Sequence, residues 1–365
     1  MGLAAPPTPS GAEKLADKVA FLSRRASHGL GPGLVERVET HMSWLFFANG
    51  MVLKLKKPVR FAYLDFSTLA KRERACRTEV ALNRALAPDV YLRVEPLRAG
   101  PRGLAVGGGA GAVVDWLVLM RPLDRAEALD RRLADRDPPT AAEIDRISDT
   151  LARFYRRAPR VRIDPVCHLA AWRRALAADR PLLLCPALGL PRGLVRRVDG
   201  VLRRTLRTRP ELLAAQVRSR RILDAHGDLR PEHIFLERGD VQVIDRLEFN
   251  AALRIADPID ELAFLDLECE RLGAPDIGRT IRRRVQRRLG ERPPEALVLF
   301  YRCHRALLRA RLSIAHLLEP SPRTPEKWPR QARAYLAIAA RDARRLDVLL
   351  NWQGDRRAPR RRAYA

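Results

Sequence analysis

The sequence predicts an α+β protein in which a small, strand-rich part precedes a larger, mostly helical part. The pair Asn49-Gly50 lies between two apolar runs, which is a strong signal for a β-hairpin. From about residue 140 onward, apolar residues recur at helical spacing. One stretch, residues 226–250, interrupts the helices with short strand-like runs and several side chains able to bind a metal. That stretch contains the main candidates for functional residues.

The composition is that of a folded protein with one large or two medium domains. The chain has 365 residues, of which 47% are hydrophobic, and this is enough for an extensive core. No apolar run approaches the roughly 18 residues needed to cross a bilayer. The first residues lack the basic start and apolar stretch of a secretory signal. The five cysteines form no close pairs, as in proteins with reduced thiols, so we expect a cytoplasmic protein without a membrane segment.

The charge of the chain is strongly positive. The net charge is +26, but only seven of the 69 basic residues are lysines and the other 62 are arginines. Such a skew indicates a genome rich in arginine codons, and the arginines are spread over helical segments rather than gathered in one stripe. The positive charge is therefore only weak evidence for nucleic-acid binding. It fits the binding of anionic small molecules equally well.

The first part, residues 13–121, follows a Pro-, Gly- and Ala-rich stretch, residues 1–12, that we expect to be disordered. A helix capped by Ser67 or Thr68 should end before Pro88. The glycine cluster between the last two strands opens no helix and lacks a following Lys-Ser/Thr, so it is not a P-loop. The predicted elements are a helix over 13–25, strands over 42–48 and 51–56, the capped helix, and strands over 90–98 and 112–120.

The second part, residues 122–350, is predicted to be helical apart from short strands around the 226–250 stretch. The last residues, 351–365, are expected to form a loose basic tail. The predicted helices cover about 140–158, 169–180, 193–206, 210–220, 258–273, 276–290, 296–318 and 326–350.

Two aspartates in the 226–250 stretch have the spacing and setting of a phosphate-handling site. Asp228 lies in a loop between two short β runs, and Asp245 ends a strand 17 residues later. A loop aspartate can orient an attacking hydroxyl and accept its proton, and a strand-end aspartate can bind Mg²⁺ between ATP phosphates. Phosphoryl transfer requires mainly positioning and charge neutralisation, so these two groups cover much of the requirement.

These residues resemble the aminoglycoside phosphotransferase and choline kinase-like family, which has a protein-kinase-like fold. The family's catalytic loop, H-x-D-x-x-x-x-N, is matched by His226, Asp228 and, at the asparagine position, His233. Its metal-binding aspartate matches Asp245, and "DPIDELA" resembles a following family motif. The segments "ETHMSWLFF", "VLKLKKPVRFAYLDFSTL" and "ELAFLDLE" are most similar to the phosphotransferase-like half of bacterial two-part proteins fused to a P-loop ATPase; without a P-loop, this chain would correspond to that half alone.

The resemblance implies a bilobal fold, with a small antiparallel β lobe carrying one helix and a larger helical lobe, and it implies ATP and Mg²⁺ as cofactors. A strand lysine would hold the α- and β-phosphates, and a helix glutamate would fix that lysine. Lys54 and Lys56 share one strand face and both remain candidates, with Lys54 favoured because Val52 then meets adenine. Glu79 is the expected helix partner and Glu73 its rival. The "MRPL" hinge at Met120 would meet adenine through its backbone.

Two substitutions depart from the family pattern. His233 replaces the asparagine that helps to bind metal, and a neutral imidazole suits softer ions such as Mn²⁺ or Zn²⁺ better than Mg²⁺. Arg246 follows Asp245 where an apolar residue is usual. The turn "ETHMSW" also replaces a glycine-rich phosphate loop. Asp245 would therefore bind the metal with His233 or Glu248 assisting, or catalysis is impaired.

Three functional interpretations remain open. The first is an enzyme, a small-molecule kinase that moves the γ-phosphate of ATP to a hydroxyl group, with Asp228 as the base. The second is a nucleotide-binding pseudoenzyme that acts through a partner protein, and the third is a metallohydrolase that uses the histidines and aspartates of the stretch as ligands. We expect His226 to be structural, Asp257 to cap a helix, and Asp260 to brace the catalytic loop. The acceptor cannot be named from the sequence, and antibiotic resistance does not follow from the resemblance.

Overall fold

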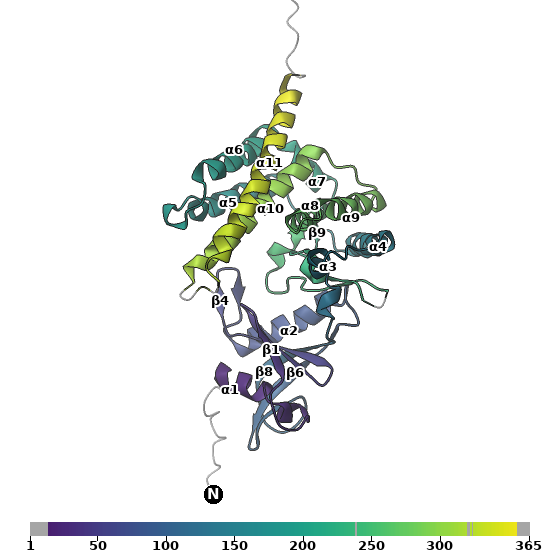
Figure 1. Cartoon of the computed structure of the whole chain (residues 1–365), viewed down its shortest axis with the longest axis vertical. Helices are drawn as coiled ribbons and strands as arrows, with labels where there is room; N and C mark the ends of the chain where they lie inside the picture. The colour runs from purple at the N-terminus through teal and green to yellow at the C-terminus, as the bar shows by residue number, and fades with distance from the viewer. Residues whose placement is uncertain (1–13, 238, 320–321, 323, 356–365) are drawn as a thin grey trace, which may run out of the picture. The chain divides into compact units, whose positions relative to one another are not determined.

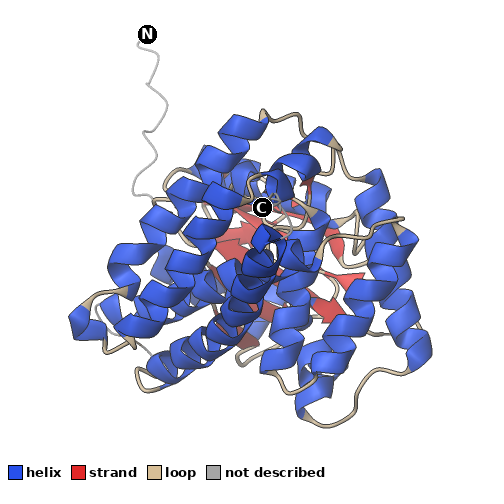
Figure 2. Ribbon diagram, turned by 90° about the horizontal axis from the view of Figure 1, so that it is seen from above, coloured by secondary structure: helices blue, strands red, loops and turns tan. Residues whose placement is uncertain are grey.

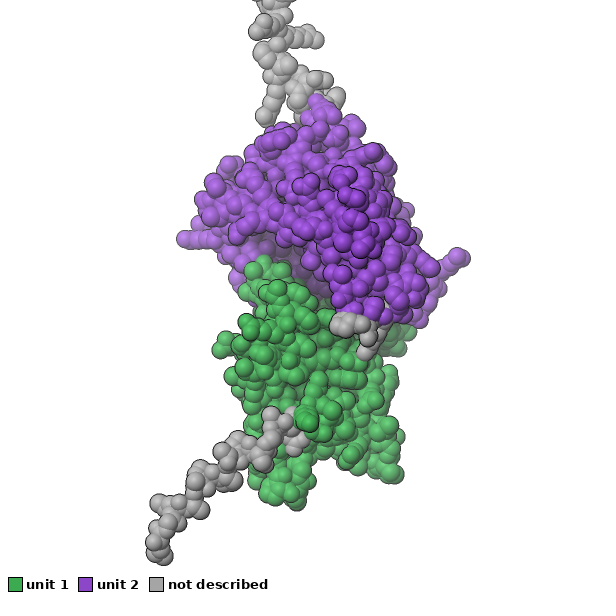
Figure 3. Space-filling model, turned by 90° about the vertical axis from the view of Figure 1, so that its left-hand side faces the viewer, with its two compact units in different colours: residues 1–128, 233–253 green, residues 129–232, 254–365 purple. Residues whose placement is uncertain are grey.

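The computed structural model describes residues 14–237, 239–319, 322 and 324–355. The chain divides into two compact units, coloured separately in Figure 3. Unit 1 comprises Met1–Ala128 and His233–Leu253, and unit 2 comprises Leu129–Glu232 and Arg254–Ala365. The N-terminal tail expected over residues 1–12 lies outside the described residues, as do residues 356–365 of the expected basic tail.

Unit 1 is built on a six-stranded antiparallel sheet in the order β1-β2-β3-β8-β6-β7 (Figure 1). The hairpin predicted at Asn49-Gly50 is present and joins β2 to β3. Asn49 has a φ of 50° and Gly50 a φ of 67°, which is the left-handed pair that a type I′ turn requires. The strands are β1 (Glu36–Glu39), β2 (Ser43–Ala48), β3 (Met51–Lys56), β6 (Tyr91–Gly100), β7 (Gly103–Val106) and β8 (Ala112–Met120).

The helices of unit 1 are α1 (Leu15–Leu22) and α2 (Leu69–Asn83), and a buried charge cluster attaches both to the sheet. Thr68 caps α2 by accepting a hydrogen bond from the amide of Lys71, as predicted. Asp115 on β8 is 1% exposed and accepts hydrogen bonds from Lys18 of α1 at 2.7 Å and from the Arg72 guanidinium of α2 at 2.7 and 3.1 Å. A buried carboxylate paired in this way fixes the position of both helices.

Some short strands of unit 1 were not predicted from the sequence. β1 reads "ERVE" and has no apolar alternation, and β4 (Arg60–Phe61) and β5 (Leu64–Asp65) are two residues long. β7 lies within the glycine-rich connection between the last two predicted strands. Strands of this kind form because a neighbouring strand offers hydrogen bonds, so their own sequences carry little signal.

The segment 233–253 belongs to unit 1 although the predicted boundary near residue 121 places it in the helical part. It contains β10 (Ile234–Phe235) and β11 (Gln242–Val243), which pair with each other. The amide of Val243 donates to the carbonyl of Leu86, and the amide of Leu236 donates to the carbonyl of Glu127. These backbone bonds attach the segment to the first part of the chain.

Unit 2 is helical, and Figure 2 shows how far helix predominates over strand in the chain. All the helices predicted for this part are present, and α3 is an additional one. Their apolar faces form one core with contributions from α5, α6, α7, α8, α10 and α11. Among the helices that the structure describes, none is long and apolar enough to cross a membrane. The helices are α3 (Leu129–Ala134), α4 (Ala141–Arg157), α5 (Pro165–Leu183), α6 (Arg192–Thr208), α7 (Glu211–Arg218), α8 (Pro258–Arg271), α9 (Pro275–Arg288), α10 (Glu295–Ala315) and α11 (Lys327–Asp355), with the short strands β9 (Leu223–Asp224) and β12 (Ile255–Ala256).

Gly278 lets α9 approach α8 closely. A Cβ atom at this position would lie 2.7 Å from Cα of Asp266 and 2.8 Å from Cβ of Cys269, which is closer than such atoms pack. Both neighbours belong to the rigid body of α8, so they cannot move aside as a flexible side chain would.

Gly278→Ala should therefore lower the free energy of unfolding by roughly 1–3 kcal/mol, as overpacking does. Gly200→Ala on α6 is the matched control, because a Cβ there meets nothing within 4 Å. The control should be neutral or stabilising by up to about 1 kcal/mol, the usual advantage of alanine over glycine in a helix. Urea denaturation of both variants measures this, and equal effects in the two would contradict the close approach of α8 and α9.

Candidate functional site

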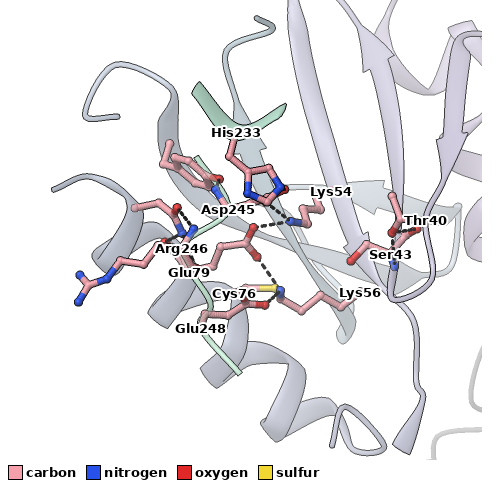
Figure 4. A network of polar contacts seen from close by, with 12 residues as sticks. Thr40, Ser43, Lys54, Lys56, Cys76, Glu79, His233, Asp245, Arg246 and Glu248 are labelled. Carbon is pink, nitrogen blue, oxygen red and sulfur yellow. Dashed lines mark hydrogen bonds and ion pairs between the residues drawn. The ribbon is translucent and has the colours of Figure 1, made fainter. Parts of the chain in front are cut away.

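Lys54 lies between two carboxylates in unit 1. Its Nζ is 2.6 Å from Oε1 of Glu79 on α2 and 3.4 Å from Oδ1 of Asp245 (Figure 4). The side chain of Glu79 is 1% exposed, whereas that of Asp245 is 44% exposed. A cation anchored at a buried carboxylate therefore faces a carboxylate that a ligand can reach. The rival Glu73 pairs with Arg77 on an exposed part of α2 instead.

Lys56 lies two residues further along β3 and is enclosed rather than accessible. Its Nζ is 2.5 Å from Oε2 of Glu79 and 2.5 Å from Oε1 of Glu248, and its side chain is 1% exposed. The lysine thus joins the strand, helix α2 and the 233–253 segment. This burial favours Lys54 over Lys56 for a contact with a ligand. Glu248, which the sequence suggested as a metal ligand, serves here as the second carboxylate of Lys56.

The charges of this cluster support one another. Burial alone would lower the pKa of Lys54, but the carboxylates of Glu79 and Asp245 outweigh it and raise that pKa well above its usual value. Burial would likewise raise the pKa of Glu79, but Lys54 and Lys56 outweigh it and lower that pKa. Burial raises the pKa of Glu248 despite the nearby Lys56. At neutral pH both lysines are therefore charged and Glu79 is ionised.

Asp245 is positioned by residues that the sequence did not identify. Its φ is 60°, a left-handed conformation that costs a non-glycine residue roughly 1–3 kcal/mol. Its amide donates to the hydroxyl of Tyr91 at 3.2 Å. The Asn83 side chain accepts from the amide of Arg246 at 2.8 Å and donates to its carbonyl at 3.3 Å. These contacts hold the strained backbone and direct the Asp245 carboxylate toward Lys54.

Arg246 itself is a structural residue in this arrangement. Its side chain is buried, and its guanidinium lies 3.5 Å from the carbonyl oxygen of Leu82 at the end of α2. A guanidinium near a helix C-terminus interacts favourably with the helix dipole. The departure from the family pattern after Asp245 therefore attaches this segment to α2.

His233 lies beside Asp245 (Figure 4). Its Nε2 is 3.8 Å from Oδ2 of Asp245, and its side chain is 10% exposed. A carboxylate oxygen and an imidazole nitrogen at this separation fit the donor preferences of a divalent cation. No group of three or more His, Cys, Asp or Glu side chains suited to holding a metal occurs within the described ranges.

The residues predicted to meet adenine are neighbours in the sheet. Val52 on β3 is paired directly with Met120 on β8. Both side chains belong to an apolar cluster that also includes Tyr91 and packs against Ile244, the residue before Asp245. Their exposed fractions are 5% and 8%, so their side chains lie at the edge of the core rather than on an open surface.

The turn before β2 is closed by the hydroxyl group of Thr40. Thr40 donates through its hydroxyl to the carbonyl of Ser43 at 2.9 Å and accepts from the Ser43 amide at 2.9 Å. The amide of Thr40 donates to the same carbonyl. The Lys57 ammonium donates to the Thr40 carbonyl at 2.7 Å. The turn is therefore rigid in a way that a glycine-rich loop is not.

Asp228 and the loop around it lie in unit 2. The Arg230 guanidinium donates to Oδ2 of Asp228 through Nε at 3.0 Å, and it also pairs with Glu232. The Asp228 side chain remains 24% exposed. Burial would lower the pKa of Arg230, but Asp228 and Glu232 outweigh it and raise that pKa. Arg230, which the sequence did not single out, holds the carboxylate in one orientation.

The loop at residues 226–228, predicted to be the catalytic loop, is braced by Glu261 and not by Asp260 as expected. The Glu261 carboxylate accepts hydrogen bonds from the amides of His226, at 3.0 Å, and Gly227. Asp260 instead accepts two hydrogen bonds from Arg305, at 2.9 and 2.6 Å. The two positions are adjacent on α8, and only the rotation of the helix in the fold decides which one faces the loop. His226 is fully buried and its Nδ1 accepts from the amide of Asp228, which is a structural role.

The sequence of the chain is similar to the sequences of other proteins. No family model matches the chain. The uncharacterized proteins Rv2004c of Mycobacterium tuberculosis and Mb2027c of Mycobacterium bovis are 33% identical to it over 286 residues. The match covers 78% of this chain and 55% of each relative, so the chain spans about half the length of the curated relatives it matches.

The chain is also similar in fold to solved structures. Choline kinase LicA from Streptococcus pneumoniae has a TM-score of 0.50 at 12% identity, covering 88% of this chain and 97% of that one. A choline/ethanolamine kinase family protein from Mesorhizobium loti has a TM-score of 0.48 at 15% identity, covering 88% and 98%. A thermostable mutant of the aminoglycoside phosphotransferase APH(4)-Ia has a TM-score of 0.46 at 13% identity, covering 85% and 94%. The likeness to LicA confirms the predicted kinase-like fold, with its antiparallel β lobe and helical lobe.

The buried Lys56 yields a prediction about stability. Lys56→Met would leave the Glu79 and Glu248 carboxylates buried with only Lys54 to balance them. The free energy of unfolding should fall by roughly 3–5 kcal/mol, the usual effect of breaking a buried ion pair, and Glu248→Leu in the same chain should restore more than half of it. Lys57→Met is the control, since Lys57 pairs with the partly exposed Glu39 and should contribute about 1 kcal/mol or less. Urea denaturation distinguishes the two lysines, and equal losses would refute the enclosed role of Lys56.

The cap of α8 yields a prediction about pH. Burial raises the pKa of Asp257 from 3.8 to about 7, although the Ile259 amide and the Tyr301 hydroxyl donate to its oxygens. The folded state therefore keeps a proton that the unfolded chain loses, so this contribution to stability is present below about pH 4 and is lost as the pH rises to about 7. Asp257→Asn preserves a good cap without the titration. The stability of the wild type relative to this variant should fall by at most about 1.4 kcal/mol per pH unit in that window, measured by denaturation at several pH values. A constant difference would contradict the raised pKa.

Proposed function

We propose that the chain is a phosphotransferase that moves the γ-phosphate of ATP to a hydroxyl group of a small molecule. The kinase-like fold supports this proposal, because LicA, which shares it, is a choline kinase. The acceptor of this chain is proposed only as a small-molecule alcohol.

The observation that carries the proposal is the position of Lys54 between Glu79 and Asp245. The buried Glu79 holds the ammonium at 2.6 Å, so little side-chain entropy remains to be lost when an anion binds. The more exposed Asp245 lies 3.4 Å from the same ammonium. A fixed cation beside an accessible carboxylate suits a phosphate chain accompanied by a metal ion, and phosphoryl transfer depends mainly on such positioning.

Asp245 and His233 would hold the metal ion, with phosphate and water oxygens completing its coordination. Bound Mg²⁺ would neutralise phosphate charge during transfer. Asp228 would orient the attacking hydroxyl and accept its proton, and Arg230 would keep the Asp228 carboxylate in a fixed orientation. The imidazole at position 233 would shift the metal preference toward Mn²⁺.

The decisive experiment measures nucleotide binding and turnover separately. Lys54→Ala should weaken ATP binding by at least about tenfold, since it removes a charge-assisted contact to phosphate. Lys57→Ala, one residue beyond the end of β3, is the matched control and should bind as the wild type does. Asp228→Asn should retain binding and lower ATP turnover by about a hundredfold or more in a panel of hydroxyl-bearing metabolites. Isothermal titration calorimetry and phosphate-release assays give the two values.

The same assay with Mg²⁺ and Mn²⁺ tests the metal site. His233→Asn should raise Mg²⁺-supported turnover relative to Mn²⁺-supported turnover, because an oxygen ligand then replaces nitrogen. Unchanged ATP binding in Lys54→Ala would refute the proposed site. Intact binding with no turnover in the wild type and in His233→Asn, under either metal, would instead support the nucleotide-binding pseudoenzyme that acts through a protein partner.

A further inference from the structure

Unit 2 contains a large cavity lined by arginines. Its volume is about 1020 Å³. Its lining residues come from α8, α9, α10 and α11, the helices labelled in Figure 1, and from the connection between α9 and α10. Eight of its lining residues are arginines and four are carboxylates. The cavity is therefore concave and carries a net positive charge, a combination that concentrates anions.

Helix α9 presents the basic wall. Besides its first residue, Pro275, five of its residues line the cavity at positions i, i+3, i+4, i+7 and i+8, so they share one face of the helix. They are Arg279, Arg282, Arg283, Gln286 and Arg287.

Part of the arginine set is committed to holding the helices together. Asp266 on α8 pairs with Arg282 at 2.8 Å and with Arg302 at 3.2 Å. Glu270, one turn further along α8, pairs with Arg302 at 2.5 Å and accepts from Arg341. Arg302 and Arg341 also pair with the buried Asp342 on α11, at 2.8 and 2.6 Å, so three arginines face three carboxylates and the charges of this network are balanced.

Three arginines on the rim are not committed. Within the described part of the chain, the side chains of Arg283, Arg287 and Arg292 make no hydrogen bond or ion pair, and all three are exposed. Each guanidinium offers five donors in a planar fork that matches phosphate oxygens. Three such groups on one concave surface provide more positive charge than the fold itself uses.

Gln286 supplies an independent observation. Its side chain is 7% exposed, and its Nε2 amide has no hydrogen-bond acceptor among the described residues. Its Oε1 accepts from Arg282, so the donor end of the amide is the unsatisfied one. A buried donor without an acceptor costs free energy, roughly 1–3 kcal/mol, unless a ligand or solvent supplies an oxygen. The same cavity therefore combines unused cations with an unused buried donor.

We propose that this cavity binds a small anion bearing two or more phosphate groups. The volume is in the range of small-molecule sites. None of the described lining residues is aromatic, so the site lacks the stacking surfaces by which proteins hold nucleic-acid bases. Several phosphates on one compact molecule can engage Arg283, Arg287 and Arg292 together and present an oxygen to Gln286.

None of the residues proposed for catalysis or metal binding lines this cavity. The motif residue Asp257 caps the start of α8, whereas Glu270 lies 13 residues further along. At the rise of an α-helix this separates the two by about 20 Å. Lys54 and Asp245 belong to unit 1, while all the cavity residues belong to unit 2.

The test is calorimetric titration with inorganic tripolyphosphate, in EDTA and 0.15 M salt (~8 Å Debye length), on the full chain. It is done in a Lys54→Ala background, so that any occupancy of the catalytic site is weakened and failure of the proposed function does not affect the result. We expect binding of one tripolyphosphate per chain. The triple variant R283Q/R287Q/R292Q should weaken it by about tenfold or more, and Gln286→Leu by about threefold to tenfold.

The matched control is R196Q/R197Q/R207Q, which removes three exposed arginines from α6 outside the cavity. These side chains also make no ion pair with the described residues, so the control loses the same charge without loss of a structural contact. Unchanged affinity in the control supports the cavity as the site. Equal weakening in both triple variants, absence of one-to-one binding, or binding only of RNA or of an acidic peptide would overturn the proposal.

Discussion

The arrangement of unit 1 depends on the two ion pairs that the carboxylate of Glu79 makes. This carboxylate is 1% exposed, and each of its oxygens binds a different lysine of β3, Lys54 on one side and Lys56 on the other. An ionised carboxylate can remain in such a place only if cations balance it, and the two lysines do so. Helix α2 and strand β3 are therefore held in a fixed position relative to each other. The direction of the Lys54 side chain is fixed before any ligand binds.

The same balance recruits the 233–253 segment. Two lysines against one carboxylate leave positive charge, and the carboxyl groups of Asp245 and Glu248 from the later segment contact these lysines at 3.4 and 2.5 Å. Asn83 on α2 then binds both backbone groups of Arg246 between them. The strained φ of Asp245 is tolerated because these neighbours determine its position from several sides. The same contacts therefore pair the charges of the cluster and fix the geometry of the site.

The positive charge of the chain has different uses in different places. In unit 2, arginines such as the buried Arg302 and the largely buried Arg305 are paired with carboxylates, so they serve packing and helix orientation rather than binding. The α9 face differs because the exposed Arg283 and Arg287 have no such partners within the described chain. The net charge of +26 by itself does not distinguish the paired arginines from the unpaired ones. Only the positions of the carboxylates show which cations remain available to a ligand.

The sequence by itself determined the elements whose signals are local. The Asn49-Gly50 turn, the cap at Thr68 and the helical periodicity of unit 2 depend on neighbouring residues, and the spacing of Asp228 and Asp245 is written in the chain. Tertiary structure decided what depends on distant residues. It placed Lys54 rather than Lys56 next to Asp245, turned Glu261 rather than Asp260 toward the loop at residues 226–228, and brought Tyr91 and Asn83 to the backbone around Asp245. Adjacent or alternate positions on one element are equivalent in sequence, and they become different only when another element packs against one of them.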